Sequence, residues 1–230
     1  MMVASTRSPI VELDGVGRSF GSDPPVHALV DVDLQVRSGE WLAIVGPSGS
    51  GKSTLLNILG LLDVQTSGVY RLDGIDVASL SDGERAGLRS RAIGFVFQSF
   101  HLMAHRSVLD NVMLSEVYRK GPQRQRGQRA QAALAQVGLS ERANFLPTRL
   151  SGGERQRAAI ARGIMGSPSV LLTDEPTGNL DSKTTAAILE LFAELNRGGL
   201  TIVTITHEPD VAERADRRVR IIDGRLTEVA

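Results

Sequence analysis

Cysteine is absent from the 230-residue sequence, which excludes disulfide bonds and metal sites built on thiolates. Apolar runs long enough to span a membrane are absent too, and the first residues contain no apolar signal-peptide core. No sign of charge predominates, because 26 Lys and Arg residues balance 26 Asp and Glu residues. We therefore expect a soluble, cytoplasmic chain with no general attraction to nucleic acid and enough length for one large domain.

A glycine-rich stretch lies between an apolar strand, residues 41–45, and an apolar helical segment, residues 55–59. The stretch reads Gly46-Pro47-Ser48-Gly49-Ser50-Gly51-Lys52-Ser53-Thr54. Its glycines lack Cβ atoms, so the backbone can turn tightly and direct N–H groups at phosphate oxygens. Lys52 adds positive charge for the outer phosphates, and Ser53 offers a hydroxyl to Mg²⁺. This order of strand, loop and helix predicts binding of a nucleoside triphosphate.

Residues 150–157 contain a second helix start with unusual chemistry. Ser151 and Glu154 have the spacing of a capping box, which predicts a helix that ends before Pro168. Gly152 and Gly153 in the first turn cost about 1 kcal/mol each relative to alanine, so they need a reason. A second phosphate site on bare backbone is one reason, and a glycine-rich turn with a good cap is the other.

Polar side chains end or follow three apolar strands predicted at 94–98, 170–176 and 200–206. Gln98 ends the first of these strands. Asp174 near the end of the second suits a magnesium ligand, and Glu175 beside it suits a base that orients attacking water. His207 follows the third strand, and this position favours a catalytic histidine over the commoner structural one.

Two smaller regions complete the pattern. Alternating apolar residues at 10–16 and 28–36, with a hairpin signal at Asp73-Gly74, predict a small antiparallel sheet, and a second hairpin signal at Asp223-Gly224 predicts a C-terminal hairpin over 220–227. Residues 100–150 have few strand signals and many Ala, Gln and Arg residues, which indicates an inserted helical lobe. Phe20 is a candidate to stack on a nucleobase, although its residue context alone favours an ordinary apolar contact.

In this order, the motifs resemble the nucleotide-binding domain of ATP-binding cassette (ABC) transporters over almost the whole chain. The similar motifs are Walker A (Gly46–Thr54), the Q-loop glutamine (Gln98), the LSGGQ signature with glutamate in its last position (Leu150–Glu154), the Walker B aspartate (Asp174), the catalytic glutamate (Glu175), the D-loop (Asn179–Asp181), the switch histidine (His207) and the base-stacking aromatic (Phe20). Thr173 departs from the family, because it makes the Walker B strand less apolar than usual. Residues 94–98 and 174–181 resemble the macrolide-export and lipoprotein-release branch.

The resemblance implies an α/β P-loop NTPase fold, with residues 1–230 forming a single ABC ATPase domain. About 10–97 and 155–230 would form a RecA-like core with a small antiparallel β-subdomain. About 98–154 would form an inserted α-helical subdomain that carries the signature motif.

The resemblance also implies a reaction that uses ATP and Mg²⁺ in a head-to-tail homodimer. Each ATP would lie between the Walker A loop of one chain and the signature of the other. The implied nucleotide contacts are Phe20, residues 46–54, Ser151, Gly152, Gly153, Glu154 and Asp181. The implied metal site comprises Ser53, Gln98 and, through coordinated water, Asp174. Lys52 and Gln98 would join Glu175 and His207 in the catalytic set, the last two positioning water and stabilising the γ-phosphate in transfer.

The partner implied by the resemblance is an integral membrane permease subunit, with no nucleic acid expected. The chain would lie on the inner face of the cell membrane and drive export or extraction, with Gln98 linking ATP to the permease. One rival is the cell-division branch, which signals across the membrane without transport. Another is a soluble ABC ATPase acting on DNA or ribosomes, which typically carries a coiled-coil insertion or a second cassette. A stand-alone nucleotide-binding regulator has no need for the signature helix.

Overall fold

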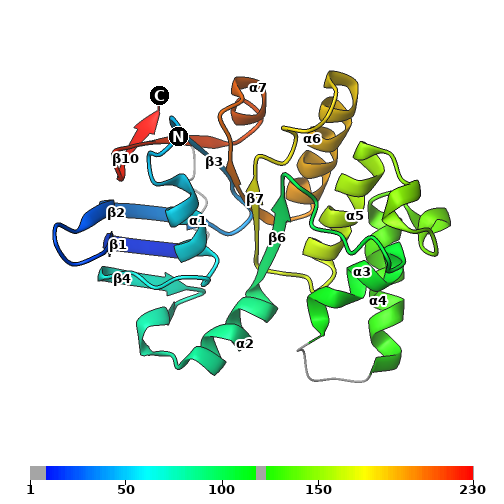
Figure 1. The fold of residues 1–230 in the computed structure, drawn as a ribbon, viewed down its shortest axis with the longest axis horizontal. Helices are drawn as coiled ribbons and strands as arrows, with labels where there is room; N and C mark the ends of the chain where they lie inside the picture. The colour runs from blue at the N-terminus through cyan, green and yellow to red at the C-terminus, as the bar shows by residue number, and fades with distance from the viewer. Residues whose placement is uncertain (1–8, 118–122, 230) are drawn as a thin grey trace, which may run out of the picture.

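The computed structural model describes residues 9–117 and 123–229, which form an α/β protein (Figure 1). Its strands are β1 (Pro9–Phe20), β2 (Val26–Arg37), β3 (Trp41–Val45), β4 (Ser67–Leu72), β5 (Ile75–Asp76), β6 (Ile93–Phe97), β7 (Val170–Asp174), β8 (Thr201–Ile205), β9 (Arg217–Ile222) and β10 (Arg225–Val229). Its α-helices are α1 (Lys52–Leu59), α2 (Asp82–Ala92), α3 (Val108–Met113), α4 (Gln123–Gln136), α5 (Gly152–Ile164), α6 (Ser182–Arg197) and α7 (Pro209–Ala212). Short 3-10 turns are η1 (Val77–Ser79), η2 (Leu114–Glu116), η3 (Ser140–Arg142) and η4 (Pro147–Arg149).

The smaller sheet is antiparallel and has the strand order β2-β1-β4-β5. Its alternating residues put one set of side chains into the core, as the sequence pattern predicts. The β4–β5 turn forms at Asp73 and Gly74, which both adopt the left-handed backbone conformation, with φ of 53° and 73°. This geometry suits the predicted hairpin, since asparagine, aspartate and glycine tolerate positive φ best.

The larger sheet has the strand order β10-β9-β3-β8-β7-β6 in the described chain. Its neighbours are parallel except for β9 and β10, which form the predicted C-terminal hairpin. The continuous apolar sequence of β3 fits its place inside this sheet, because strands buried on both faces need no polar side.

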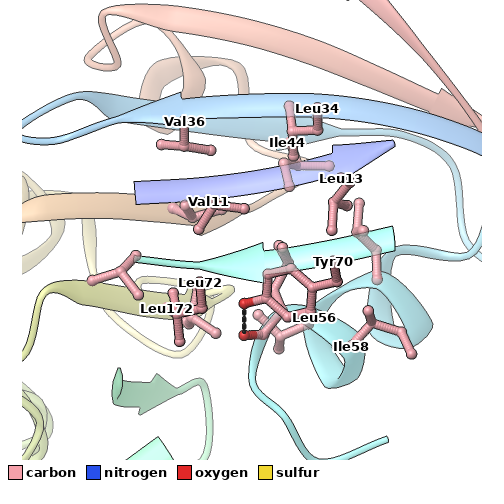
Figure 2. Close-up of a cluster of buried hydrophobic side chains, with 14 of the residues drawn as sticks. Val11, Leu13, Leu34, Val36, Ile44, Leu56, Ile58, Tyr70, Leu72 and Leu172 are labelled. Carbon is pink, nitrogen blue, oxygen red and sulfur yellow. Dashed lines mark hydrogen bonds between the residues drawn. The ribbon is translucent and has the colours of Figure 1, made fainter. Parts of the chain in front are cut away.

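A core of aliphatic side chains joins the two sheets to α1 (Figure 2). The labelled side chains come from β1 and β2, from β3 and β7, from β4 and from α1, and α1 lies next to the antiparallel sheet in Figure 1. Tyr70 in β4 is fully buried, and its hydroxyl donates a 2.8 Å hydrogen bond to the carbonyl of Leu59 at the end of α1. Burial raises the pKa of Tyr70, so the hydroxyl stays protonated and holds α1 in place.

Helices α3, α4, α5 and α6 gather on the other side of the larger sheet, away from β1, β2 and β4 (Figure 1). Ala130, Leu134 and Val137 are buried in a second apolar cluster with α3 and α5. Gly138 follows α4 with a φ of 72°, which suits the cap after a helix. No helix within the described ranges is both long enough and apolar enough to cross a membrane.

Thr173, the polar residue inside β7, has a buried hydrogen-bond partner. The Thr173 hydroxyl donates to Thr204 Oγ1 in β8 at 2.9 Å, and Trp41 Nε1 in β3 donates to the same oxygen at 3.0 Å. All three side chains are at most 2 % exposed. A buried polar group without a hydrogen-bond partner costs free energy of folding. These linked hydrogen bonds therefore explain how β7 tolerates a threonine.

Helix α5 touches β6 through glycine. A Cβ on Gly94 of β6 would lie 2.2 Å from the carbonyl oxygen of Gly163 in α5. A Cβ on Gly163 would lie 2.9 Å from Leu171 Cδ1 and 3.2 Å from the Phe95 carbonyl oxygen. Both glycines are therefore required for the backbone of the helix to rest directly on the strand.

Candidate active site

Four parallel strands end level with one another, which brings the predicted site residues together. The level positions are the register pairs Ile44–Ile205, Ile205–Asp174 and Asp174–Phe97. Segments that follow the carboxyl ends of parallel strands meet at one edge of the sheet, where ligands of such sheets bind. The glycine loop, Gln98, Glu175 and His207 all follow this line within two residues.

The glycine loop is shaped by close contacts as well as by backbone conformation. Gly49 and Gly51 have positive φ values of 78° and 105°. A Cβ on Gly46 would lie 2.3 Å from the carbonyl oxygen of Ile221, and one on Gly51 would lie 2.5 Å from that of Ala28. The loop is therefore held between β2 and the C-terminal hairpin, and larger residues at these positions would displace it.

Lys52 begins α1 and folds back over the loop. Its ammonium group donates to the carbonyl oxygens of Gly46 and Pro47 at 2.8 and 2.7 Å. The N-cap of α1 is Gly51, which provides no side-chain hydrogen bond to the first turn. The helix start thus keeps N–H groups and a positive dipole end for an anion.

A cavity of about 900 Å³ opens at this edge, within the size range of small-molecule sites. The predicted residues that line it are 46–49, 51–54, Gln98, Asp174, Glu175 and His207. The structure therefore brings most of the predicted site residues to one cavity, although some of them are more than 100 positions apart in the sequence.

The donors that line the cavity fit a magnesium ion. Ser53, Gln98 and Asp174 supply a hydroxyl, an amide oxygen and a carboxylate, which are the hard oxygen ligands that Mg²⁺ prefers. Burial first, and then the charge of Glu175, raise the pKa of Asp174 above its ordinary value, while Lys52 opposes the shift. A cation beside Asp174 would relieve that unfavourable charge.

Glu175 is joined to the segment after β8 by several hydrogen bonds. It has a φ of 45°, which is a strained conformation for a residue with a side chain. Its carboxylate accepts from the His207 N–H at 3.1 Å and the Thr206 hydroxyl at 3.2 Å, and His207 Nδ1 lies 2.7 Å from its Oε1. The bond with Glu175 and the negative charge of Glu175 raise the pKa of His207. The pair is therefore oriented across two strand ends, as a base and its partner require.

The remaining predicted site residues do not line this cavity in the part of the chain that the structure describes. They are Phe20, Ser50, residues 151–154 and Asp181. Phe20 is 43 % exposed, and the Arg18 guanidinium lies 4.4 Å from the centre of its ring. Ser50 is a buried residue of the loop, and Asp181 caps α6 by accepting from the N–H and hydroxyl of Thr184.

The predicted capping box forms at the start of α5. Ser151 Oγ accepts from the Glu154 N–H at 3.2 Å, and Glu154 Oε2 accepts from the Ser151 N–H at 2.8 Å. Glu154 Oε1 also accepts from Arg142 Nε at 3.2 Å. None of the residues of this second helix start lines the cavity that the glycine loop lines.

Gly153 has a packing reason that the sequence pattern did not reveal. A Cβ on Gly153 would lie 2.5 Å from Thr184 Cγ2 in the first turn of α6. A Cβ on Gly152 would meet Leu180 Cδ2 at 3.3 Å, which is tight but less severe. The first turn of α5 therefore packs against α6 in a way that Gly153 permits.

Gln98 is placed by contacts that sequence reasoning missed. Its carbonyl accepts from Asn179 Nδ2 at 3.0 Å, and a Cβ on Gly178 would lie 2.7 Å from its Nε2. Just beyond it, Phe100 and His101 both have positive φ, at 58° and 49°. Arg162 of α5 donates to both of their carbonyl oxygens, at 2.7 Å for Phe100, which stabilises this turn.

Several cavity residues had no local sequence signal that indicated a place in this site. Val26, His27 and Ala28 come from β2, and Asp223 and Gly224 come from the β9–β10 turn. The Gly224 N–H donates to the Ser50 carbonyl at 3.0 Å, so the turn also supports the loop. Its hairpin motif predicted the turn itself, but only the sheet order places that turn beside the loop.

The loop between β3 and α1, with acidic and polar groups at the ends of neighbouring parallel strands, defines the P-loop class of nucleotide-binding proteins. Comparison with known proteins specifies the family. Residues 29–178 match the family described as ABC transporter. The chain is 50 % identical over 218 residues to the ABC transporter ATP-binding protein YvrO of Bacillus subtilis, which covers 94 % of this chain and 95 % of that protein.

The chain is also 48 % identical over 227 residues to the macrolide export ATP-binding/permease protein MacB of Rhodospirillum rubrum, covering 98 % of this chain. It spans only 35 % of the length of that relative. Among solved structures, the dimeric ABC transporter cassette MJ0796 has a TM-score of 0.84 and 38 % identity, over 96 % of this chain and 99 % of that one. A second structure of MJ0796 is a post-hydrolysis state bound to ADP and phosphate.

This chain belongs to the ABC transporter family and is an ATP-binding cassette that hydrolyses ATP to drive transport. The predicted family, fold class and ATPase activity are confirmed. The roles of individual residues and the use of Mg²⁺ stay predictions.

Proposed function

We propose that two copies of this chain hold two ATP molecules between them and separate after hydrolysis. The observation that carries this proposal is the placement of two helix starts whose chemistry suits phosphate. The start of α1 lines the cavity, whereas Ser151 and the first turn of α5 do not contribute to that wall in the described chain. A second chain would bring its own Ser151 to the open side of the cavity. The dimeric form of the related cassette MJ0796 supports this arrangement.

Within each shared site, the geometry supports distinct roles. Lys52 and the N–H groups of the loop would bind the outer phosphates. Ser53, Gln98 and Asp174 would hold Mg²⁺, which when bound neutralises charge on those phosphates. Glu175 would orient the attacking water, and His207 would stabilise the γ-phosphate during transfer, since the two are already hydrogen-bonded.

The transported substrate would be selected by a permease, and we propose that this permease is a separate membrane protein. The similarity to YvrO, an ABC transporter ATP-binding protein, supports a separate partner. The similarity to MacB proteins, which are named as macrolide export ATP-binding/permease proteins, supports export. The chain would then act at the inner face of the cell membrane, with Gln98 linking ATP to the permease.

The dimer is tested with Glu175→Gln, which is nearly isosteric. We expect this variant to bind ATP and sediment as a dimer, while hydrolysis falls by about 10²–10⁴-fold, the usual scale for a positioned base. Adding Ser151→Arg should abolish the dimer and leave ATP binding at the loop intact. ATP-dependent dimerisation that survives Ser151→Arg would contradict the shared site.

A mixing experiment sharpens the test. Lys52→Ala chains should bind ATP poorly and form no dimer, and Ser151→Arg chains should form none either. In a mixture, one of the two shared sites is wild-type on both faces, so some mixed dimer is expected.

ATP turnover measured with added DNA or RNA should be unchanged, and a large stimulation at physiological salt would favour the soluble, nucleic-acid-linked branch instead.

A further inference from the structure

The signature motif of this chain places a carboxylate at a helix start that is proposed to bind phosphate. Glu154 Oε2 accepts from the Ser151 N–H at 2.8 Å, so the carboxylate lies beside Ser151. The hydrogen bond from that N–H is the main reason why the pKa of Glu154 lies below its usual range. The Ser151 hydroxyl and the Arg142 guanidinium lower it further. Glu154 is therefore negatively charged at neutral pH, and its charge would repel a triphosphate near Ser151.

Arg142 is positioned to offset that charge. It ends the 3-10 turn η3, and its Nε lies 3.2 Å from Glu154 Oε1. Its guanidinium also lies 4.8 Å from the centre of the Phe145 ring, a cation–π contact that limits its freedom. The side chains of Arg142 and Glu154 are 46 % and 30 % exposed, so water screens the pair in a single chain.

The same helix start keeps donors for an anion. In the hydrogen bonds of the described chain, the N–H groups of Gly152 and Gly153 have no protein acceptor. These are the groups that the first turn of a helix leaves unpaired. Their attraction for phosphate depends on the net charge of the side chains around them.

We propose that Arg142 is a positioning residue of the shared nucleotide site, which neutralises Glu154 so that the start of α5 attracts the triphosphate bound by the partner. This inference rests on the proposed ATP-bridged dimer. Closing the dimer covers both side chains and removes the water that screens them, so the balance of charge matters most in the closed state.

The test compares four chains, all carrying Glu175→Gln, by their ATP-dependent dimerisation constants in analytical ultracentrifugation. The chains are the parent, Arg142→Gln, Glu154→Gln and the double variant. We expect Arg142→Gln to weaken the dimer by about tenfold or more, because like charges then face each other in both sites. Glu154→Gln should dimerise at least as tightly as the parent. The double variant, whose pair is neutral again, should return to within about threefold of the parent.

Arg149→Gln is the matched control, since Arg149 is an exposed arginine in the neighbouring turn η4 with no ion pair among the described residues. It should leave the dimer unchanged. The weakening by Arg142→Gln should also shrink as salt is raised. A purely structural role predicts instead that the double variant stays as weak as Arg142→Gln.

The two proposals fail in different ways. If the parent variant stays monomeric with ATP, that result contradicts the proposed ATP-bridged dimer and with it the proposed role of Arg142. A parent that dimerises, with Arg142→Gln equally tight or the double variant not restored, overturns only the role of Arg142. Binding of a fluorescent ATP analogue to the loop should be the same in all four chains, which checks that each is folded.

Discussion

Gly153→Ala is expected to have opposite effects on stability in two backgrounds that differ by one methyl group. In the wild-type chain, the new Cβ would lie 2.5 Å from Thr184 Cγ2. Thr184 cannot rotate away freely, because its hydroxyl donates to Asp181 Oδ2 at 2.6 Å at the start of α6. The contact therefore forces a shift of α5 against α6 or the loss of that hydrogen bond.

The magnitude follows from two opposing contributions. Overpacking of this kind costs about 1–3 kcal/mol, and alanine gains about 1 kcal/mol over glycine inside a helix. Gly153→Ala alone should thus lower the free energy of unfolding by up to about 2 kcal/mol. Thr184→Ser removes Cγ2 and keeps the hydroxyl, and the next atoms, Thr184 Cβ and Oγ1, lie 3.8 and 3.9 Å away, at ordinary contact distance. In that background, Gly153→Ala should raise stability by about 1 kcal/mol.

Urea unfolding measures both changes, and the single tryptophan of the chain, Trp41, is buried and reports the transition by fluorescence. The four chains are wild type, each single variant and the double variant. A destabilisation by Gly153→Ala of the same size in both backgrounds would refute the packing account. That result would leave phosphate binding as the explanation for a glycine at position 153.

Two further outcomes are expected. Thr204→Val leaves Trp41 Nε1 and the Thr173 hydroxyl without their shared buried acceptor, so it should lower the free energy of unfolding by about 2–5 kcal/mol. Thr173→Val, which removes only a donor, should cost about 1 kcal/mol in the same urea titration, and equal losses would contradict the network. The Glu175 carboxylate raises the pKa of His207 above its unfolded value of about 6.5, so their pair stabilises the fold fully below that pH and less as pH rises through the folded pKa. His207→Ala should therefore cost more stability near pH 6 than near pH 9, by at most about 1 kcal/mol since the ring is largely exposed, and a pH-independent loss would argue against the ion pair.

The sequence indicated those candidate site residues that stand at the ends of strands and that the structure brings to one cavity. Gln98, Asp174 and His207 were recognisable because each follows or ends an apolar run, and parallel strands bring such positions to one edge. The phosphate loop was equally clear, since its glycines and Lys52 lie within one short stretch, residues 46–52.

Sequence reasoning missed the contacts between segments that are distant in the chain. Gly224 supports the loop from 174 positions beyond Ser50, and nothing in its own hairpin motif indicates that neighbour. The contact of Gly153 with Thr184 depends on how closely α5 and α6 pack. The pairing of Arg142 with Glu154 depends on how the chain returns from α4 to α5. These features require the tertiary arrangement, which periodicity and motif spacing do not encode.

The glycine contact between α5 and β6 has a mechanical consequence. Because the Gly163 carbonyl rests against Gly94 with no side chain between them, the helix cannot tilt or slide without pushing the strand. The helix starts at Ser151, and the strand leads into Gln98. In the proposed dimer, Ser151 serves the nucleotide held by the partner, whereas Gln98 serves the nucleotide held by its own chain. A displacement of α5 at one ATP would therefore also move β6, which leads to the other ATP. Hydrolysis at the two sites would then be correlated rather than independent.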